Sequence, residues 1–302
     1  MASAANQQSG EWSDGWAWSD DSLRLHWRER AAAPGVPANR PVLLCLPGMT
    51  RTARDFAALG DWMDGRWRVV AVDIRGRGES GWARDPLTYV SLIYLRDLSR
   101  ILAEAGIDRF VVLGSSLGGQ LALQMTTAHR AAMAGVILND IGPESLPAGL
   151  ARLRSNVGRG GNWPTWIHAA RDLAQRNGNI YPHWQLADWL GFAKRLCRLS
   201  PQGKIILDYD PRIAEPLRLP HSDAGSDLWA ALDSLSGVPV LSLRAELSDV
   251  FSSAAQAELV RRVPGLVAAV VPDVGHAPAL DEPAARAAID DFLERMIAGD
   301  VT

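Results

Sequence analysis

The sequence predicts an α/β protein in which helices cover both faces of a mostly parallel sheet. Short apolar runs alternate with helical stretches along most of the 302 residues, which is the pattern of βαβ units. Several runs are apolar at every position, as in strands buried on both faces of a parallel sheet. Hydrophobic residues make up 47% of the chain and charged residues 22%, which is enough apolar material for a sizeable core.

The elements of the first half follow in order from this pattern. Apolar residues alternate with polar ones between positions 12 and 27, which predicts a pair of half-buried strands. After a loop at 31–41, buried strands are expected at 42–48, 67–73, 109–114 and 135–140. Helices are expected between and after them, near 52–64, 88–105 and 117–128.

The alternation stops at residue 142 and resumes after residue 236. The interrupted segment looks helical and rich in loops, and it holds Trp163, Trp166, Trp184, Trp189 and Trp229. We therefore expect a core in two parts, residues 11–141 and 237–298, with a helical cap at 142–236 inserted over the sheet. The second part is expected to contain strands at 238–244 and 266–272 and helices near 253–262 and 283–298.

Composition excludes several classes of function. The net charge of -3 leaves no basic excess to pair with nucleic-acid phosphates. Two cysteines, Cys45 and Cys197, are too few for a disulfide scaffold. No Cys/His cluster has the spacing of metal ligands, so we expect neither metal nor cofactor. The polar start lacks a signal pattern, and no apolar run approaches the roughly 18 residues of a membrane span, so we expect a cytoplasmic protein without a membrane partner.

The most informative motif is Gly114-Ser115-Ser116-Leu117-Gly118, which matches G-x-S-x-G. It follows an expected strand and begins an expected helix, so it would place Ser116 on a sharp strand-to-helix turn. Small residues are needed two positions before and after such a turn, and both are glycine. A plain turn is the alternative, but the context favours Ser116 as a nucleophile.

A serine nucleophile needs a base, and the base needs an orienting acid. His276 stands in a loop between a buried strand and a helix, where catalytic groups of parallel sheets gather, and it is the expected base. Asp249 is the preferred acid because nucleophile, acid and base would then follow their own strands in that order. Glu246 and Asp140 remain alternatives. The backbone N–H groups of Leu117 and Met49 are the expected oxyanion donors.

Five segments carry a family resemblance: LPGMTRTARDF (46–56), DIRGRGES (73–80), GSSLGG (114–119), RAELSD (244–249) and VGHAP (274–278). In these segments the sequence resembles the α/β-hydrolase family, and together they make the resemblance extend over nearly the whole chain. The resemblance implies the α/β-hydrolase fold, the triad Ser116, Asp249 and His276, the donors Leu117 and Met49, and a cap that shapes the substrate pocket. It also implies that the arginines of DIRGRGES belong to a structural turn. The chain departs from the family at Pro47-Gly48, where His-Gly is usual, and at Ala245, where glycine is usual.

The expected activity is cleavage of a carboxylic ester or lactone through an acyl-enzyme on Ser116. The chain is similar to 3-oxoadipate enol-lactonases, cofactor-free haloperoxidases and carboxylesterases. Carbon–carbon bond hydrolases, perhydrolases and hydroxynitrile lyases use the same triad and remain alternatives, as does a receptor-like binding protein on the same fold. We expect a monomer or homodimer acting on a small apolar or aromatic substrate, with one or two cap tryptophans lining the pocket.

Overall fold

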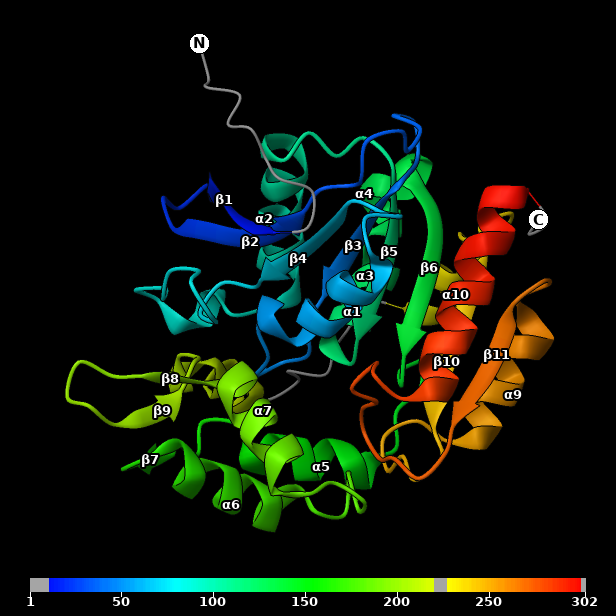
Figure 1. Ribbon diagram of the computed structural model, residues 1–302. Helices are drawn as coiled ribbons and strands as arrows, with labels where there is room; N and C mark the ends of the chain where they lie inside the picture. Colours follow the sequence, from blue (N-terminus) through cyan, green and yellow to red (C-terminus); the bar gives the residue numbers. More distant parts are fainter. Residues whose placement is uncertain (1–10, 220–226, 300–302) are drawn as a thin grey trace.

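The computed structural model describes residues 11–219 and 227–299 and confirms the predicted fold class (Figure 1). Its main sheet has eight strands in the order β1-β2-β4-β3-β5-β6-β10-β11. The strands are β1 (Trp12–Trp18), β2 (Arg24–Arg30), β3 (Val42–Leu46), β4 (Val69–Asp73), β5 (Phe110–Ser115), β6 (Met133–Asn139), β10 (Val240–Ala245) and β11 (Val267–Val271). Strands β1 and β2 are antiparallel to their neighbours, and the pairs from β4 through to β11 are parallel.

Each face of the sheet has its own hydrophobic core, because successive side chains of a strand point to opposite faces. On β3, Leu44 faces one core and Leu43 the other. The first core is covered by α2 (Ser91–Glu104), α3 (Leu117–Gln124), α8 (Leu228–Asp233) and α9 (Ser253–Arg262). The second is covered by α1 (Ala57–Met63) and α10 (Pro283–Ala298). The strand β3 is buried at all five positions, as its continuous apolar run predicted.

Residues 147–218, which we call the cap layer, lie along the edge of the sheet where its parallel strands end (Figure 1). The layer contains α5 (Pro147–Asn156), α6 (Trp166–Asn177) and α7 (Leu186–Leu196). It is not purely helical, since β7 (Asn162–Trp163), β8 (Cys197–Leu199) and β9 (Ile205–Leu207) form a separate antiparallel sheet. Helix α8 lies within the expected cap range but packs against α3 of the core, and residues 220–226 of that range lie outside the described residues.

The cap layer has a core of its own, built largely from aromatic side chains. Trp163, Trp189 and Phe192 are buried there. Trp184 stacks on Tyr181 with ring centroids 3.7 Å apart. In the described part of the chain, no helix has both the length and the apolar character needed to cross a membrane.

Candidate active site

Ser116 stands on a strained turn between β5 and α3. Its backbone has φ 52° and ψ −116°, a positive-φ conformation that is rare for a residue with a side chain. The flanking glycines make the turn sterically feasible. A Cβ on Gly114 would lie 2.4 Å from the carbonyl oxygen of Gly118, and a Cβ on Gly118 would lie 2.0 Å from that of Leu46. The fold therefore requires glycine at both positions, as the motif predicted.

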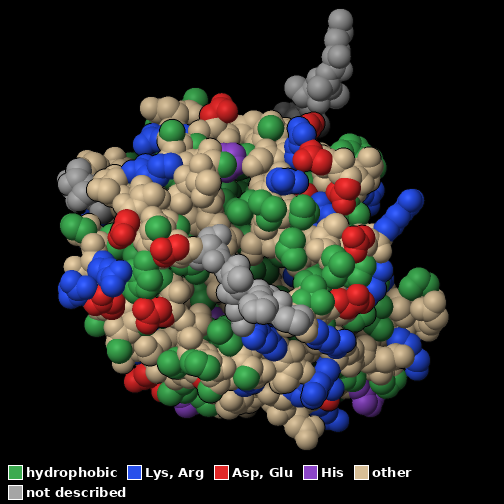
Figure 2. Space-filling model, turned by 180° about the vertical axis from the view of Figure 1, so that it is seen from behind, with side chains coloured by type: hydrophobic (Ala, Val, Ile, Leu, Met, Phe, Trp, Pro, Cys, Tyr) green, Lys and Arg blue, Asp and Glu red, His purple; other side chains and the backbone are tan. Residues whose placement is uncertain are grey.

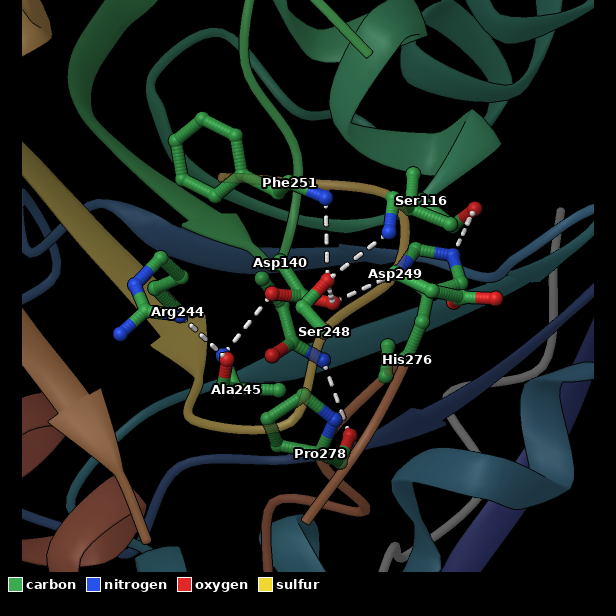
Figure 3. A network of polar contacts seen from close by, with 12 residues as sticks. Ser116, Asp140, Arg244, Ala245, Ser248, Asp249, Phe251, His276 and Pro278 are labelled. Carbon is green, nitrogen blue, oxygen red and sulfur yellow. Dashed lines mark hydrogen bonds and ion pairs between the residues drawn. The ribbon is translucent and has the colours of Figure 1, made fainter. Parts of the chain in front are cut away.

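The hydroxyl of Ser116 lies against the imidazole of His276. The Ser116 Oγ is 2.8 Å from His276 Nε2, and Figure 3 shows the two side chains pointing toward each other. On the far side of the ring, His276 Nδ1 is 2.7 Å from Asp140 Oδ2. The side chains of His276 and Asp140 are only 3% and 0% exposed, so water does not compete for these contacts. A proton on Nδ1, donated to Asp140, leaves Nε2 free to accept the Ser116 proton.

The Asp140 carboxylate is fixed by three donors. Besides His276, it accepts hydrogen bonds from the backbone N–H of Ala245, at 2.8 Å, and from the Ser248 hydroxyl, at 2.7 Å. Asp140 follows directly after β6, and its backbone has φ 55°. This turn, the N–H of Ala245 at the end of β10 and the Ser248 hydroxyl in the loop that follows aim the carboxylate at the imidazole (Figure 3).

The prediction that Asp249 contacts the imidazole is wrong. The Asp249 carboxylate instead accepts two hydrogen bonds from Arg152, from Nε at 2.5 Å and from Nη2 at 2.7 Å. This guanidinium lowers the pKa of Asp249. The alternative Glu246 is also turned away and accepts the backbone N–H of Asp273 at 3.0 Å. Of the three acids weighed from the sequence, the structure brings only Asp140 to His276.

The two expected oxyanion donors lie beside the nucleophile. Leu117 begins α3 directly after Ser116, and Met49 lines the same cavity as Ser116. Among the described residues, neither backbone N–H donates a hydrogen bond within the protein. The Met49 carbonyl oxygen accepts a hydrogen bond from the buried Nε of Arg77 at 2.8 Å, which fixes the following peptide plane. The positions of Leu117 and Met49 are compatible with an oxyanion hole.

A cavity of about 230 Å³ opens from Ser116 between the core loops and the cap layer. Its aromatic side chains are Phe56, Tyr181, Phe192 and Tyr209, and its arginines are Arg51, Arg152, Arg159, Arg176 and Arg195. No tryptophan is among the described residues of its wall, so the expected tryptophan lining is wrong. Trp163 and Trp189 are buried in the core of the cap layer, which is the structural role that large side chains also serve.

The other histidines that the structure describes contact residues other than Ser116 or lie on the surface. His26 is buried between Asp73 and Asp14, and His129 contacts Ser99. His168 bonds to Thr165 on the surface, His183 is exposed, and His221 lies outside the described residues. Within residues 11–219 and 227–299, no group of three or more His, Cys, Asp or Glu side chains is arranged to hold a metal ion.

Comparisons with known proteins agree with this fold. The family model described as "alpha/beta hydrolase fold" matches residues 41–202. A 3-hydroxybutyrate-oligomer hydrolase of Cupriavidus necator is 32% identical over 268 residues, which cover 86% of this chain and 90% of that protein. A crystal structure of an alpha/beta hydrolase from Novosphingobium aromaticivorans is 45% identical, has a TM-score of 0.89, and covers 95% of this chain and 99% of its own.

Proposed function

Because the chain belongs to the α/β-hydrolase fold family, we propose that it is a serine hydrolase that cleaves a carboxylic ester or lactone. The observation that carries this proposal is the continuous contact from Ser116 through His276 to Asp140, with steps of 2.8 Å and 2.7 Å. A neutral serine hydroxyl is a weak nucleophile, and an imidazole within hydrogen-bond reach activates it.

In the proposed reaction, His276 Nε2 takes the Ser116 proton while Oγ attacks the substrate carbonyl carbon. The carbonyl oxygen becomes an oxyanion, which the N–H groups of Leu117 and Met49 stabilise; such a donor typically contributes about 3–4 kcal/mol to lowering the barrier. The imidazolium then gives its proton to the departing alkoxide, and an acyl-enzyme on Ser116 remains. Water, deprotonated by His276, releases the acid and restores the hydroxyl.

In this scheme Asp140 has the role that the sequence analysis assigned to Asp249. Its carboxylate holds the imidazole in the tautomer with the proton on Nδ1 and stabilises the imidazolium as it forms. Ala245 and Ser248 keep the carboxylate in place, so the imidazole does not have to reorient during the reaction. The choice of an ester substrate is supported by the Cupriavidus necator relative, whose stated substrate is an oligomer of 3-hydroxybutyrate, a hydroxy acid that oligomerises through ester bonds.

A fluorophosphonate probe tests the proposal because it reacts with an activated serine. The native protein should be labelled once per chain and should hydrolyse p-nitrophenyl esters. Ser116→Ala should abolish labelling and lower kcat by roughly a million-fold, the loss typical of removing a serine nucleophile.

Ser115→Ala is the matched control, because it removes the neighbouring hydroxyl and should leave the protein labelled. Absence of labelling in the native protein would contradict the proposal and favour a receptor-like binding protein. Labelling that persists in Ser116→Ala would mean that a residue other than Ser116 is the nucleophile.

A further inference from the structure

The wall of the active-site cavity is rich in arginine. Five arginines line it, whereas Asp55 is the only acidic side chain among the described lining residues. The surrounding cap layer shares this bias. Residues 147–218 hold eleven Lys and Arg but five Asp and Glu, a net charge of +6 in a chain whose net charge is -3. Basic side chains also gather in the lower part of the face in Figure 2.

Three of the five lining arginines are neutralised by a carboxylate of their own. Arg152 binds Asp249 through two hydrogen bonds. Arg176 Nε lies 2.9 Å from an Asp172 carboxylate oxygen on the same helix. Arg51 donates two hydrogen bonds to Asp55, from Nε at 2.5 Å and from Nη2 at 2.7 Å.

The other two, Arg159 and Arg195, are not neutralised in this way. Arg159 forms no ion pair among the described residues. Arg195 Nε lies 3.8 Å from Asp55 Oδ1, beyond hydrogen-bond distance, and Asp55 is already engaged by Arg51. Two of the five guanidinium groups in the cavity wall therefore have no carboxylate bonded to them among the described residues.

Arg51 and Arg195 lie together on one side of the cavity. Their guanidinium carbons are 4.3 Å and 5.9 Å from the ring centroid of Phe192. Their side chains are 21% and 26% exposed, and that of Asp55 is 18% exposed, so the three-membered cluster is partly shielded from water. With two cations and one anion, this cluster has a net charge of +1 in a site of reduced dielectric.

The cluster is also close to the nucleophile. The Cγ of Arg51 and the Cβ of Ser116 lie 3.3 Å and 3.7 Å from the point that a Cβ on Gly48 would occupy. The Arg51 side chain thus begins beside Ser116 and leads toward Arg195. A substrate held at Ser116 can place a second group a few bonds away against these guanidiniums.

We propose that this site takes esters that carry a free carboxylate, and that Arg195, next to Arg51 and Asp55, binds that carboxylate. The inference rests on the proposed ester hydrolysis at Ser116. A guanidinium offers paired N–H donors that match a carboxylate, and charge-assisted bonds of this kind are stronger than neutral ones. The bound carboxylate brings the cluster to two cations and two anions, which removes its excess charge. The carboxylate only binds, and the reacting ester bond stays at Ser116.

Two esters of equal shape measure this preference. Mono-p-nitrophenyl adipate ends in a carboxylate, and p-nitrophenyl adipamate ends in the neutral amide. For the native protein, we expect kcat/KM to be at least about tenfold higher for the adipate than for the adipamate, since a hydrogen bond to a charged group typically corresponds to a factor of ten to a hundred. Arg195→Gln should reduce this ratio to near one, mainly through the KM of the adipate. The ratio cancels any general loss of activity.

Lys194→Gln is the matched control. It removes one positive charge from the same helix, but Lys194 is exposed and does not line the cavity. The adipate-to-adipamate ratio should survive this substitution. A ratio near one in the native protein, or an equal fall in both variants, would overturn the proposed carboxylate site.

Binding to the Ser116→Ala variant separates this inference from the proposed function. Calorimetry on Ser116→Ala should show tighter binding of the adipate ester than of the adipamate, and the added Arg195→Gln change should remove the difference. This difference in binding without any ester hydrolysis by the native protein would contradict the proposed function and leave the carboxylate site standing. Hydrolysis of both esters with equal binding would contradict the carboxylate site alone.

Discussion

The contacts of its carboxylate distinguish Asp140 from Asp249 as the acid that orients His276. Asp140 accepts hydrogen bonds from His276, Ala245 and Ser248 and is fully buried, while Asp249 is 40% exposed and engaged by Arg152. We expect Asp140→Asn to lower kcat by roughly ten-thousand-fold, because the amide keeps the shape but favours the wrong imidazole tautomer. Asp249→Asn should lower kcat by less than about tenfold, since it removes only the Arg152 pair. Steady-state hydrolysis of a p-nitrophenyl ester measures both.

Urea unfolding of the same two proteins provides the control, because a loss of kcat in a protein of normal stability is a loss of chemistry. A collapse of kcat in Asp249→Asn, with Asp140→Asn nearly unaffected, would restore the acid chosen from the sequence.

The sequence analysis identified two of the three residues that these hydrogen bonds connect, Ser116 and His276. Ser116 was found because its motif needs glycines at fixed positions, and His276 because it follows a strand. Asp140 also follows a strand, but so do Asp249 and Glu246, and the order of residues along the chain favoured the wrong one. Only the folded backbone shows that φ 55° at Asp140 and the N–H of Ala245 direct this carboxylate to the imidazole. The burial of Arg75 and Arg77, by contrast, agrees with the structural turn that the resemblance implied.

At the scale of elements, a buried histidine connects the two N-terminal strands to the rest of the sheet. His26 on β2 has its Nδ1 2.7 Å from Asp73 at the end of β4, and its Nε2 3.1 Å from Asp14 on β1. Asp73 also accepts the backbone N–H groups of Ala53 and Glu79. Burial disfavours the charged imidazole. The hydrogen bond to the Asp73 carboxylate and the negative charge of that carboxylate outweigh this effect, so the pKa of His26 is raised above 6.5.

This raised pKa makes the contribution of His26 to stability dependent on pH. A folded-state pKa above the unfolded value of 6.5 means that the added stability is complete below pH 6.5 and is lost as the pH rises through the folded-state pKa. We expect His26→Gln to lower the free energy of unfolding by about 1–3 kcal/mol near pH 6, and by less near pH 9. Urea unfolding of both proteins at the two pH values measures the difference. An equal loss at both would mean that His26 acts through packing alone.

The element pattern was more predictable in the core than in the cap layer. Strands β3 to β6 are continuous apolar runs, and burial on both faces of a parallel sheet leaves that pattern in the sequence. Strands β7, β8 and β9 have only two or three residues, which is too short for any periodicity to be recognised. The tryptophans were misplaced for a related reason. A large aromatic side chain can fill a small core or line a pocket, and the sequence does not distinguish these two roles. Trp163 and Trp189 are buried in the core of the cap layer.

At the scale of the whole molecule, positive charge is concentrated over the active site. The cap layer carries a net charge of +6 while the chain carries -3, so the remaining residues are strongly acidic. The excess positive charge of the cap layer favours anions in the part of the cavity lined by Arg159 and Arg195. The field of this charge acts over a distance that shrinks from about 20–30 Å at low salt to about 3 Å at 1 M salt.

This field predicts a salt dependence that only charged substrates show. Raising NaCl from about 20 mM to about 500 mM should lower kcat/KM severalfold for mono-p-nitrophenyl adipate, because screening weakens both the attraction during encounter and the contact with Arg195. The adipamate has the same shape and no charge, so its kcat/KM should change little, and it controls for any effect of salt on the fold or on Ser116. Parallel salt dependence of the two esters would mean that the arginine excess of the cap layer does not act on the substrate. If Arg195→Gln keeps part of the salt-dependent fall in kcat/KM for the adipate, the part that remains measures the long-range field of the cap layer. The part that is lost measures the local contact with Arg195.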